Sequence, residues 1–303
     1  MNKSILFGIL GIILLVTSAG ATASSTSMTK SDWAQEMNLT PTPGIGCWMA
    51  SYPSTTWTSV PCSTTDAGPF TIGGSYGDDP AESINYPTTA GEGIFTSESG
   101  FTSESDSTHG ANWYSLQLNS NTFTTTVSGK STTAWEQFIF YNEGTGGNTG
   151  TVFIQFWLIG YGTCPSGWTS YGSSCYRNSP AATPGYEGPG TLNYYTVTGT
   201  VSSTTDTAKF CNTNAGLCYS TTDSDRVNLY SSNWWDSEFN VFGSPSSQAN
   251  FNAGTSLGLK VDNFEPGENC PATPFSYTAE TNNLSLGTCT GSTTLQYITF
   301  SES

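Results

Sequence analysis

Residues 152–159 have the sequence Val-Phe-Ile-Gln-Phe-Trp-Leu-Ile. Successive side chains of a β-strand point to opposite faces, so one wholly apolar face is formed here by Val152, Ile154, Phe156 and Leu158. The opposite face carries Phe153, Gln155 and Trp157. This alternation predicts a strand whose apolar face lies in a hydrophobic core.

The same kind of alternation recurs along the second half of the chain. It marks further strands at 113–119, 135–141, 192–201, 234–242, 256–261 and 295–300. Turn-forming clusters such as 143–150 and 243–248 separate some of them. We find no helical pattern of ten or more residues. The sequence therefore predicts an all-β chain folded as an antiparallel β-sandwich.

The alternation also predicts which side chains share a face. Core positions are expected in two segments at Tyr114, Leu116 and Leu118, and at Trp235, Phe239 and Val241. The other face collects Trp135, Gln137, Gln155 and Trp157 together with Trp234, Asp236, Glu238 and Asn240. An ordinary solvated sheet face would carry Thr, Ser and Lys instead. Exposed aromatic and amide side chains are typical of a surface that holds an extended polymer, either a peptide or a glycan.

Composition excludes several classes of function. The chain has 303 residues, with 7 Lys and Arg, 23 Asp and Glu, a net charge of −16 and one histidine. That charge excludes a basic face for nucleic acid or anionic lipid. A single histidine excludes HExxH zinc sites, sites with several histidine ligands and most catalytic triads that do not use His109. We expect His109 to be an exposed loop residue, and we expect no metal or cofactor.

The N-terminus predicts export. Lys3 precedes the apolar run 5–16, and the small residues Ala21-Thr22-Ala23 stand at a usual cleavage spacing. We expect a signal peptide over 1–23, with an uncleaved anchor as the alternative, and a secreted chain that leaves the membrane after cleavage. We further expect a leader or pro-segment at 24–46, a loop-rich part packed on the core at 47–111, and the sandwich at 112–303.

Eight cysteines follow the signal segment. An even number in an exported chain predicts disulfides rather than zinc, and no CxxC pair is present. Spacing alone does not fix the connectivity. We prefer sequential pairs: Cys47 with Cys62, Cys164 with Cys175, Cys211 with Cys218, and Cys270 with Cys289.

Three stretches carry a resemblance to a known family. They are Trp135-Glu136-Gln137-Phe138, Phe153-Ile154-Gln155-Phe156-Trp157 and Ser237-Glu238-Phe239-Asn240. Their order and approximate spacing resemble the glutamic peptidases (eqolisins), over residues 135 to about 261. Phe138 departs from the family's Gly after the Gln, and Phe239 from its Trp after the Glu. The whole chain also resembles secreted proteins of unknown activity, at 246–252 and 280–284.

The resemblance implies an acid endopeptidase on a concanavalin-like sandwich. Glu238 would activate a water and then protonate the leaving amine, and Gln137 would donate an amide N–H to the oxyanion. An extended polypeptide substrate would lie against Trp135, Gln155, Trp157 and Asn240. The resemblance also implies an inhibitory pro-segment within 24–108.

Two other classes of function stay open from the residues. Asp236 and Glu238, two apart on one face, could serve a glycosidase, and Trp135, Trp157 and Trp234 could stack sugars in a binding module. A coat protein would need only the Ser- and Thr-rich surface. A peptidase requires Gln137 and Glu238 to reach one water, whereas a glycosidase requires two carboxylates across an open groove.

Overall fold

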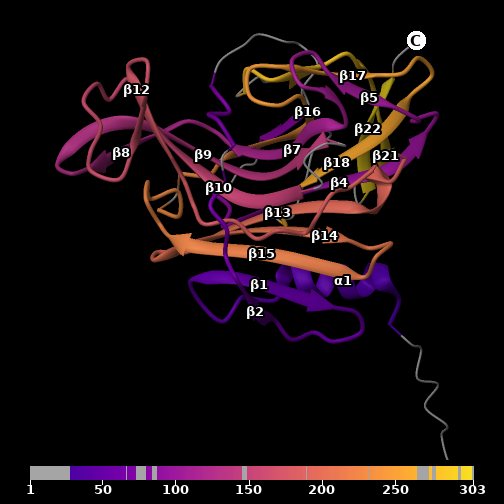
Figure 1. The fold of residues 1–303 in the computed structure, drawn as a ribbon, viewed down its shortest axis with the longest axis horizontal. Coiled ribbons are helices and arrows are strands. Elements are labelled where there is room, and N and C mark those ends of the chain that lie inside the picture. The colour runs from indigo at the N-terminus through magenta and orange to yellow at the C-terminus, as the bar shows by residue number, and fades with distance from the viewer. Residues whose placement is uncertain are drawn as a thin grey trace, which may run out of the picture.

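The structure is a computed structural model, and it describes residues 28–65, 67–72, 80–83, 87–144, 149–188, 190–231, 233–264, 273–274, 278–292 and 295–301. These residues are mostly β, in three sheets with one α-helix, α1 (Lys30–Leu39) (Figure 1). Every pair of strands described is antiparallel except β17 with β20. The predicted signal segment lies outside the described residues.

Two large sheets make up most of the chain. Sheet I has nine strands, in the order β2 (Thr58–Val60), β1 (Gly46–Ser51), β15 (Leu217–Ser224), β14 (Thr205–Asn212), β13 (Tyr195–Val201), β4 (Ala90–Ser99), β18 (Ser256–Asp262), β22 (Leu295–Ser301) and β21 (Ser285–Ser292). Sheet II also has nine, in the order β11 (Thr169–Tyr171), β12 (Ser174–Asn178), β10 (Thr149–Ile159), β9 (Lys130–Glu143), β7 (Trp113–Ser120), β16 (Asp236–Phe242), β3 (Pro80–Ser83) and β19 (Thr273–Pro274), with β8 (Phe123–Val127) paired to β9. A smaller sheet III orders β20 (Thr281–Asn282), β17 (Gln248–Phe251), β5 (Glu104–Asp106) and β6 (Gly110–Ala111).

Sheets I and II pack face to face around one large core. Phe140 of β9 stacks on Phe210 of β14, with ring centroids 4.0 Å apart. Gly199 of β13 lies under Phe138, where an added Cβ would come within 2.4 Å of the ring. The absence of a side chain there lets the aromatic rings of sheet II approach sheet I closely. The predicted core faces are confirmed at Tyr114, Leu116, Leu118, Phe239, Val241 and the four apolar positions of β10.

The strands predicted from alternation are present, with shifted ends. The segment predicted at 135–141 belongs to the longer β9, and the strand predicted at 192–201 begins only at Tyr195, after the 3₁₀ turn η1 (Leu192–Tyr194). Sheet I contains strands that the pattern did not mark, among them β14 and β15, and β4 in the stretch expected to be loop-rich. Their polar side chains explain the omission, because Thr, Ser and Asp alternate there with few apolar residues.

The helix α1, which is ten residues long, corrects the expectation that the chain has no helix of ten or more residues. Thr29 accepts a hydrogen bond from the Asp32 backbone N–H at 3.1 Å, and its own N–H donates to the Asp32 carboxylate at 3.2 Å, which makes a capping box. Trp33 and Met37 are fully buried against the outer face of sheet I, beside the cysteines of β14 and β15. Residues 30–39, expected in a leader or pro-segment, are therefore packed into the fold.

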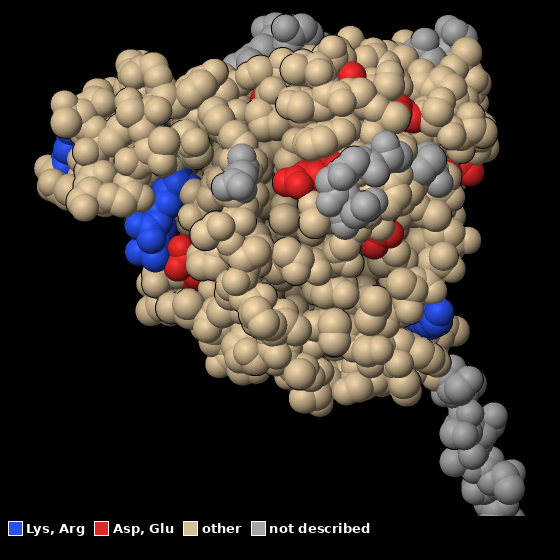
Figure 2. Space-filling model, viewed as in Figure 1, with Lys and Arg blue, Asp and Glu red and all other residues tan. Residues whose placement is uncertain are grey.

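Three of the four predicted disulfides are confirmed: Cys47–Cys62, Cys164–Cys175 and Cys211–Cys218. The fourth prediction involves Cys270, which lies outside the described residues. Such bridges are typical of exported proteins. Charged side chains are sparse on the face that Figure 2 shows. Across the part of the chain that the structure describes, no helix has the length and apolar character needed to span a membrane.

Candidate active site

The candidate site lies on the outer face of sheet II, the face turned away from the large core. Four strands place polar side chains opposite one another there. Gln155 of β10 pairs with Gln137 of β9, Gln137 with Asn119 of β7, and Asn119 with Glu238 of β16. Since neighbouring strands lie about 4.8 Å apart, Gln137 and Glu238 have Cα atoms about 10 Å apart in one cross-strand row. The structure therefore brings the two predicted catalytic residues to the same row, with Asn119 between them.

Hydrogen bonds fix the orientation of the Gln137 amide. The indole N–H of Trp157 donates to Gln137 Oε1 at 3.2 Å, and an indole N–H can only donate. The atom facing Trp157 is therefore the oxygen, and Gln137 Nε2 points the other way, where it donates to Gln117 Oε1 of β7 at 3.0 Å. The donor end of Gln137 is directed toward the strand that separates it from Glu238.

Glu238 accepts a hydrogen bond from a neighbouring amide. Asn119 Nδ2 donates to Glu238 Oε2 at 2.7 Å, and the Glu238 side chain has no exposed surface. Gln117 and Asn119 were not among the predicted site residues, although they continue the alternation of Trp113 and Ser115 along β7. The signal that could have identified them was the run of amides at every second position, once the strand was placed between β9 and β16.

The four residues predicted to lie against the substrate are enclosed. Trp135, Gln155, Trp157 and Asn240 are each at most 1% exposed. Trp135 donates its indole N–H to the Ser120 carbonyl at 2.9 Å, and its ring lies 6.5 Å from that of Trp157. The expectation of an exposed aromatic face is wrong, because alternation defines the two faces of a strand but not what covers each of them.

The cover over Gln155 is the segment 67–72. The backbone N–H of Phe70 donates to Gln155 Oε1 at 2.8 Å, and Gln155 Nε2 donates to the Gly68 carbonyl at 3.2 Å. The Phe70 ring lies 5.5 Å from Tyr141 and 6.3 Å from Phe153, on the same outer face of sheet II. A stretch of the N-terminal part thus makes backbone hydrogen bonds to the predicted substrate-binding residue Gln155.

Residues at the start of β16 depart from the predicted faces. Trp234, expected on the outer face, is buried in the core and stacks on Phe138 at 5.4 Å, whereas Trp235, expected in the core, is 42% exposed. The strand begins at Asp236, so the alternation does not extend to the two tryptophans. Asp236 itself is 7% exposed.

Glu136 points to the opposite side from Gln137, as the alternation predicted. Its carboxylate is fully buried and has no hydrogen-bond partner among the described residues. Burial, reinforced by the nearby Asp206 and Asp225 carboxylates, raises the pKa of Glu136 well above its ordinary value. Glu136 therefore belongs to the interior, on the other side of sheet II from Glu238.

No family model, curated protein or solved structure matches this chain.

Proposed function

We propose that this chain is a secreted acid endopeptidase of the glutamic type, carried on a disulfide-stapled, concanavalin-like antiparallel sandwich. The observation that carries the proposal is the row on sheet II. Gln137 directs its amide donor toward the strand next to Glu238, and both side chains lie in one network of amides. A neutral donor beside a carboxylate is the pair that water-activated amide hydrolysis needs when no histidine takes part.

The reaction follows from the two side chains. Glu238 takes a proton from a water, whose oxygen forms a bond to the scissile carbonyl carbon. The carbonyl oxygen then carries the negative charge and accepts a hydrogen bond from Gln137 Nε2. The protonated Glu238 next donates its proton to the amide nitrogen, the C–N bond breaks, and the two products are a carboxylic acid and an amine.

The substrate in this proposal is an extended polypeptide that occupies the place of the segment 67–72. That segment already presents a backbone N–H and a carbonyl to Gln155, as a substrate strand would. Trp135, Trp157 and Asn240 flank the same row. The described conformation is then the closed state, and cleavage requires the segment to be displaced. Secretion is supported by the three disulfides and by the signal-like residues 1–23.

The test is cleavage of an acid-unfolded protein between about pH 2 and pH 7. We expect wild type to cleave at low pH in the presence of pepstatin and chelators. Glu238→Gln and Gln137→Ala should each reduce the rate by roughly 100-fold or more. Glu36→Gln and Gln35→Ala, the same substitutions at exposed positions of α1, should leave the rate unchanged. Unfolding curves of all variants separate lost activity from lost folding.

If neither wild type nor variants cleave the substrate at any pH, even after an attempt at self-processing, the result would count against the proposed peptidase function. The same face would then be screened against glycans, because a carbohydrate-active or carbohydrate-binding sandwich is the alternative that its aromatic side chains allow.

A further inference from the structure

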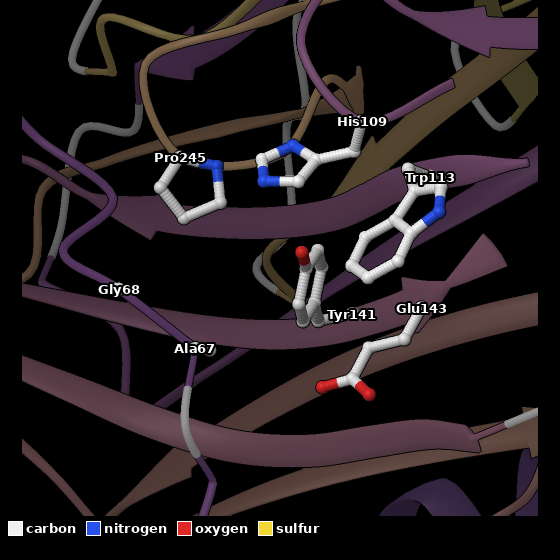
Figure 3. A pocket seen from close by; sticks show the side chains of 7 residues that line it. All are labelled: Ala67, Gly68, His109, Trp113, Tyr141, Glu143 and Pro245. Carbon is white, nitrogen blue, oxygen red and sulfur yellow. The ribbon is translucent and has the colours of Figure 1, made fainter. Parts of the chain in front are cut away.

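A cavity of about 470 Å³ opens on the outer face of sheet II, away from the buried row. Its walls carry the side chains of His109, Trp113, Tyr141 and Glu143, with Pro245 and residues 67–68 beside them (Figure 3). Tyr141 lies four residues from Gln137 on β9, which is about 13 Å along the strand. The cavity is therefore separate from the Gln137 and Glu238 pair.

The imidazole of His109 is held in one orientation by two neighbours. Ser244 Oγ donates to Asp106 Oδ2 at 2.9 Å, so the Ser244 oxygen is left to accept from His109 Nδ1, 2.6 Å away. Asp106 Oδ1 lies 3.2 Å from the same nitrogen. Nδ1 therefore carries a proton, and Nε2 of the neutral ring is an acceptor on the cavity side (Figure 3).

Hydrogen bonds favour the ionised form of the Asp106 carboxylate, which contacts His109 on the side away from the cavity. Burial raises the pKa of its carboxyl, but hydrogen bonds from the backbone N–H groups of Ser244, Thr108 and His109 outweigh that effect and hold the pKa below its ordinary value. The Asp106 side chain has no exposed surface. Its negative charge increases the electron density at the cavity-facing nitrogen, as it does for histidines that bind cations.

Aromatic rings form the rest of the wall. His109 stacks on Trp113, with centroids 4.9 Å apart and planes 24° apart, and Trp113 lies 6.1 Å from Tyr141. Burial raises the pKa of the Tyr141 phenol, which keeps its hydroxyl protonated and uncharged. The rings offer π-electron density, which attracts cations.

The polar groups of this cavity are complementary to a cation. Glu143 is held by the Thr149 hydroxyl, which donates to Glu143 Oε2 at 2.7 Å, and its side chain extends below Tyr141 in Figure 3. The lining residues include no Lys or Arg. A carboxylate, an imidazole acceptor and aromatic rings together require a ligand that brings positive charge and several N–H donors.

We propose that this cavity binds a guanidinium or alkylammonium group. The group would place its N–H donors on Glu143 and His109 Nε2 and its charge against Trp113 and Tyr141. Its source is either a small organic amine or a basic side chain of a polypeptide. The proposal does not rest on the peptidase function, since the binding chemistry is the same whether or not the chain cleaves peptides.

The single histidine makes the test direct, because the imidazole Cε1–H of His109 gives one proton resonance from the whole chain. At about pH 8 the chain is titrated with agmatine and with acetyl-Gly-Gly-Arg-Gly-Gly-amide. The control peptide has citrulline in place of arginine, which keeps the shape and removes the charge. We expect a saturable shift of the His109 resonance with a cationic ligand and a much weaker one with citrulline.

Two variants test whether binding in this cavity causes the shift of the His109 resonance. Glu143→Gln should weaken binding roughly tenfold, because it removes the charge and keeps an acceptor for Thr149. Glu36→Gln removes the same charge from exposed α1 and should leave binding unchanged. Equal affinity for agmatine and the arginine peptide supports a small amine, and tighter binding of the peptide supports a basic side chain. Absence of any shift, equal binding of citrulline, or equal weakening by both variants would overturn the proposal.

Discussion

A single lysine holds the end of the helix α1. Lys209 of β14 donates its ammonium group to the carbonyls of Asn38 at 2.6 Å, Thr40 at 2.9 Å and Met37 at 3.3 Å. The last carbonyls of a helix have no partner within the helix, and a cation is favourable at that end. Burial lowers the pKa of Lys209 to about 8, although the nearby Glu92 opposes this shift. The buried charge is therefore tied to the capping of α1.

We predict that Lys209→Met destabilises the fold by about 3 kcal/mol, because it keeps the length of the side chain and leaves buried carbonyls without a donor. Urea unfolding near neutral pH measures the difference. Lys30→Met is the matched control: its ammonium also donates to a carbonyl, that of Asn214 at 2.6 Å, but in an exposed position. A loss of equal size in both variants would show that the helix does not depend on Lys209.

The alternation of side chains along a strand predicts which residues share a face, but it does not predict which faces are buried. It placed Gln137 and Gln155 on one face with Glu238, and the register of sheet II agrees. It could not show that these side chains are buried, because burial depends on other segments; Gln155, for example, is covered by Phe70, which lies 85 residues earlier in the chain and has no pattern of its own. It failed at Trp234 for a local reason, since the strand begins two residues later.

At the scale of elements, the segment 67–72 covers one residue of the candidate site, Gln155. Besides its bonds to Gln155, its Thr71 carbonyl accepts from the Ala279 N–H at 2.8 Å, so it is also attached to the C-terminal part of the chain. The fully buried ring of Phe70 packs on the outer face of sheet II. Displacing the segment must break these contacts together.

We predict that Phe70→Ala speeds the amide hydrogen exchange of residues 67–72 and, in the proposed peptidase, raises the initial rate of cleavage. The cavity left by Phe→Ala costs about 3–5 kcal/mol locally, enough to favour displacement of the segment. Phe101→Ala is the control, because Phe101 is also buried but packs on Phe251, 5.1 Å away near sheet III. A cleavage rate that falls equally in both variants would contradict a covering role for the segment.

The elements that sequence patterns missed share a physical cause. The strands β14 and β15 lie between the core and α1, so both of their faces are covered. Their buried side chains include Lys209, Asp206, Ser220 and Thr221, which hydrophobic alternation does not mark. The helix α1 is ten residues long and has only one buried stripe, with Trp33, Ala34 and Met37. Its capping box at Thr29 and Asp32 was the available signal.

At the scale of the whole molecule, buried carboxyl groups outnumber buried cations among the residues that the structure describes. Burial raises the pKa of Glu92 and of Glu280 to about 7, and that of Glu104 and of Asp206 to about 9. A raised carboxyl pKa means that the folded chain holds protons that the unfolded chain has released. Their stabilising contribution is complete below the ordinary carboxyl pKa and is lost as pH rises through the folded value.

We therefore predict that the free energy of unfolding falls between about pH 5 and pH 9, with about 3 kcal/mol lost for a fully buried carboxyl such as Glu280. Lys209 opposes this trend only above about pH 8, where its own proton leaves. Urea unfolding at several pH values measures the slope.

Asp206→Asn should flatten the upper part of the curve of unfolding free energy against pH, because the amide has no proton to lose. Asp225→Asn, at a less buried neighbour, should flatten it less. A stability that stays constant or rises over this range would mean that these carboxyl groups are ionised in the folded chain, and that the fold is not adapted to acid.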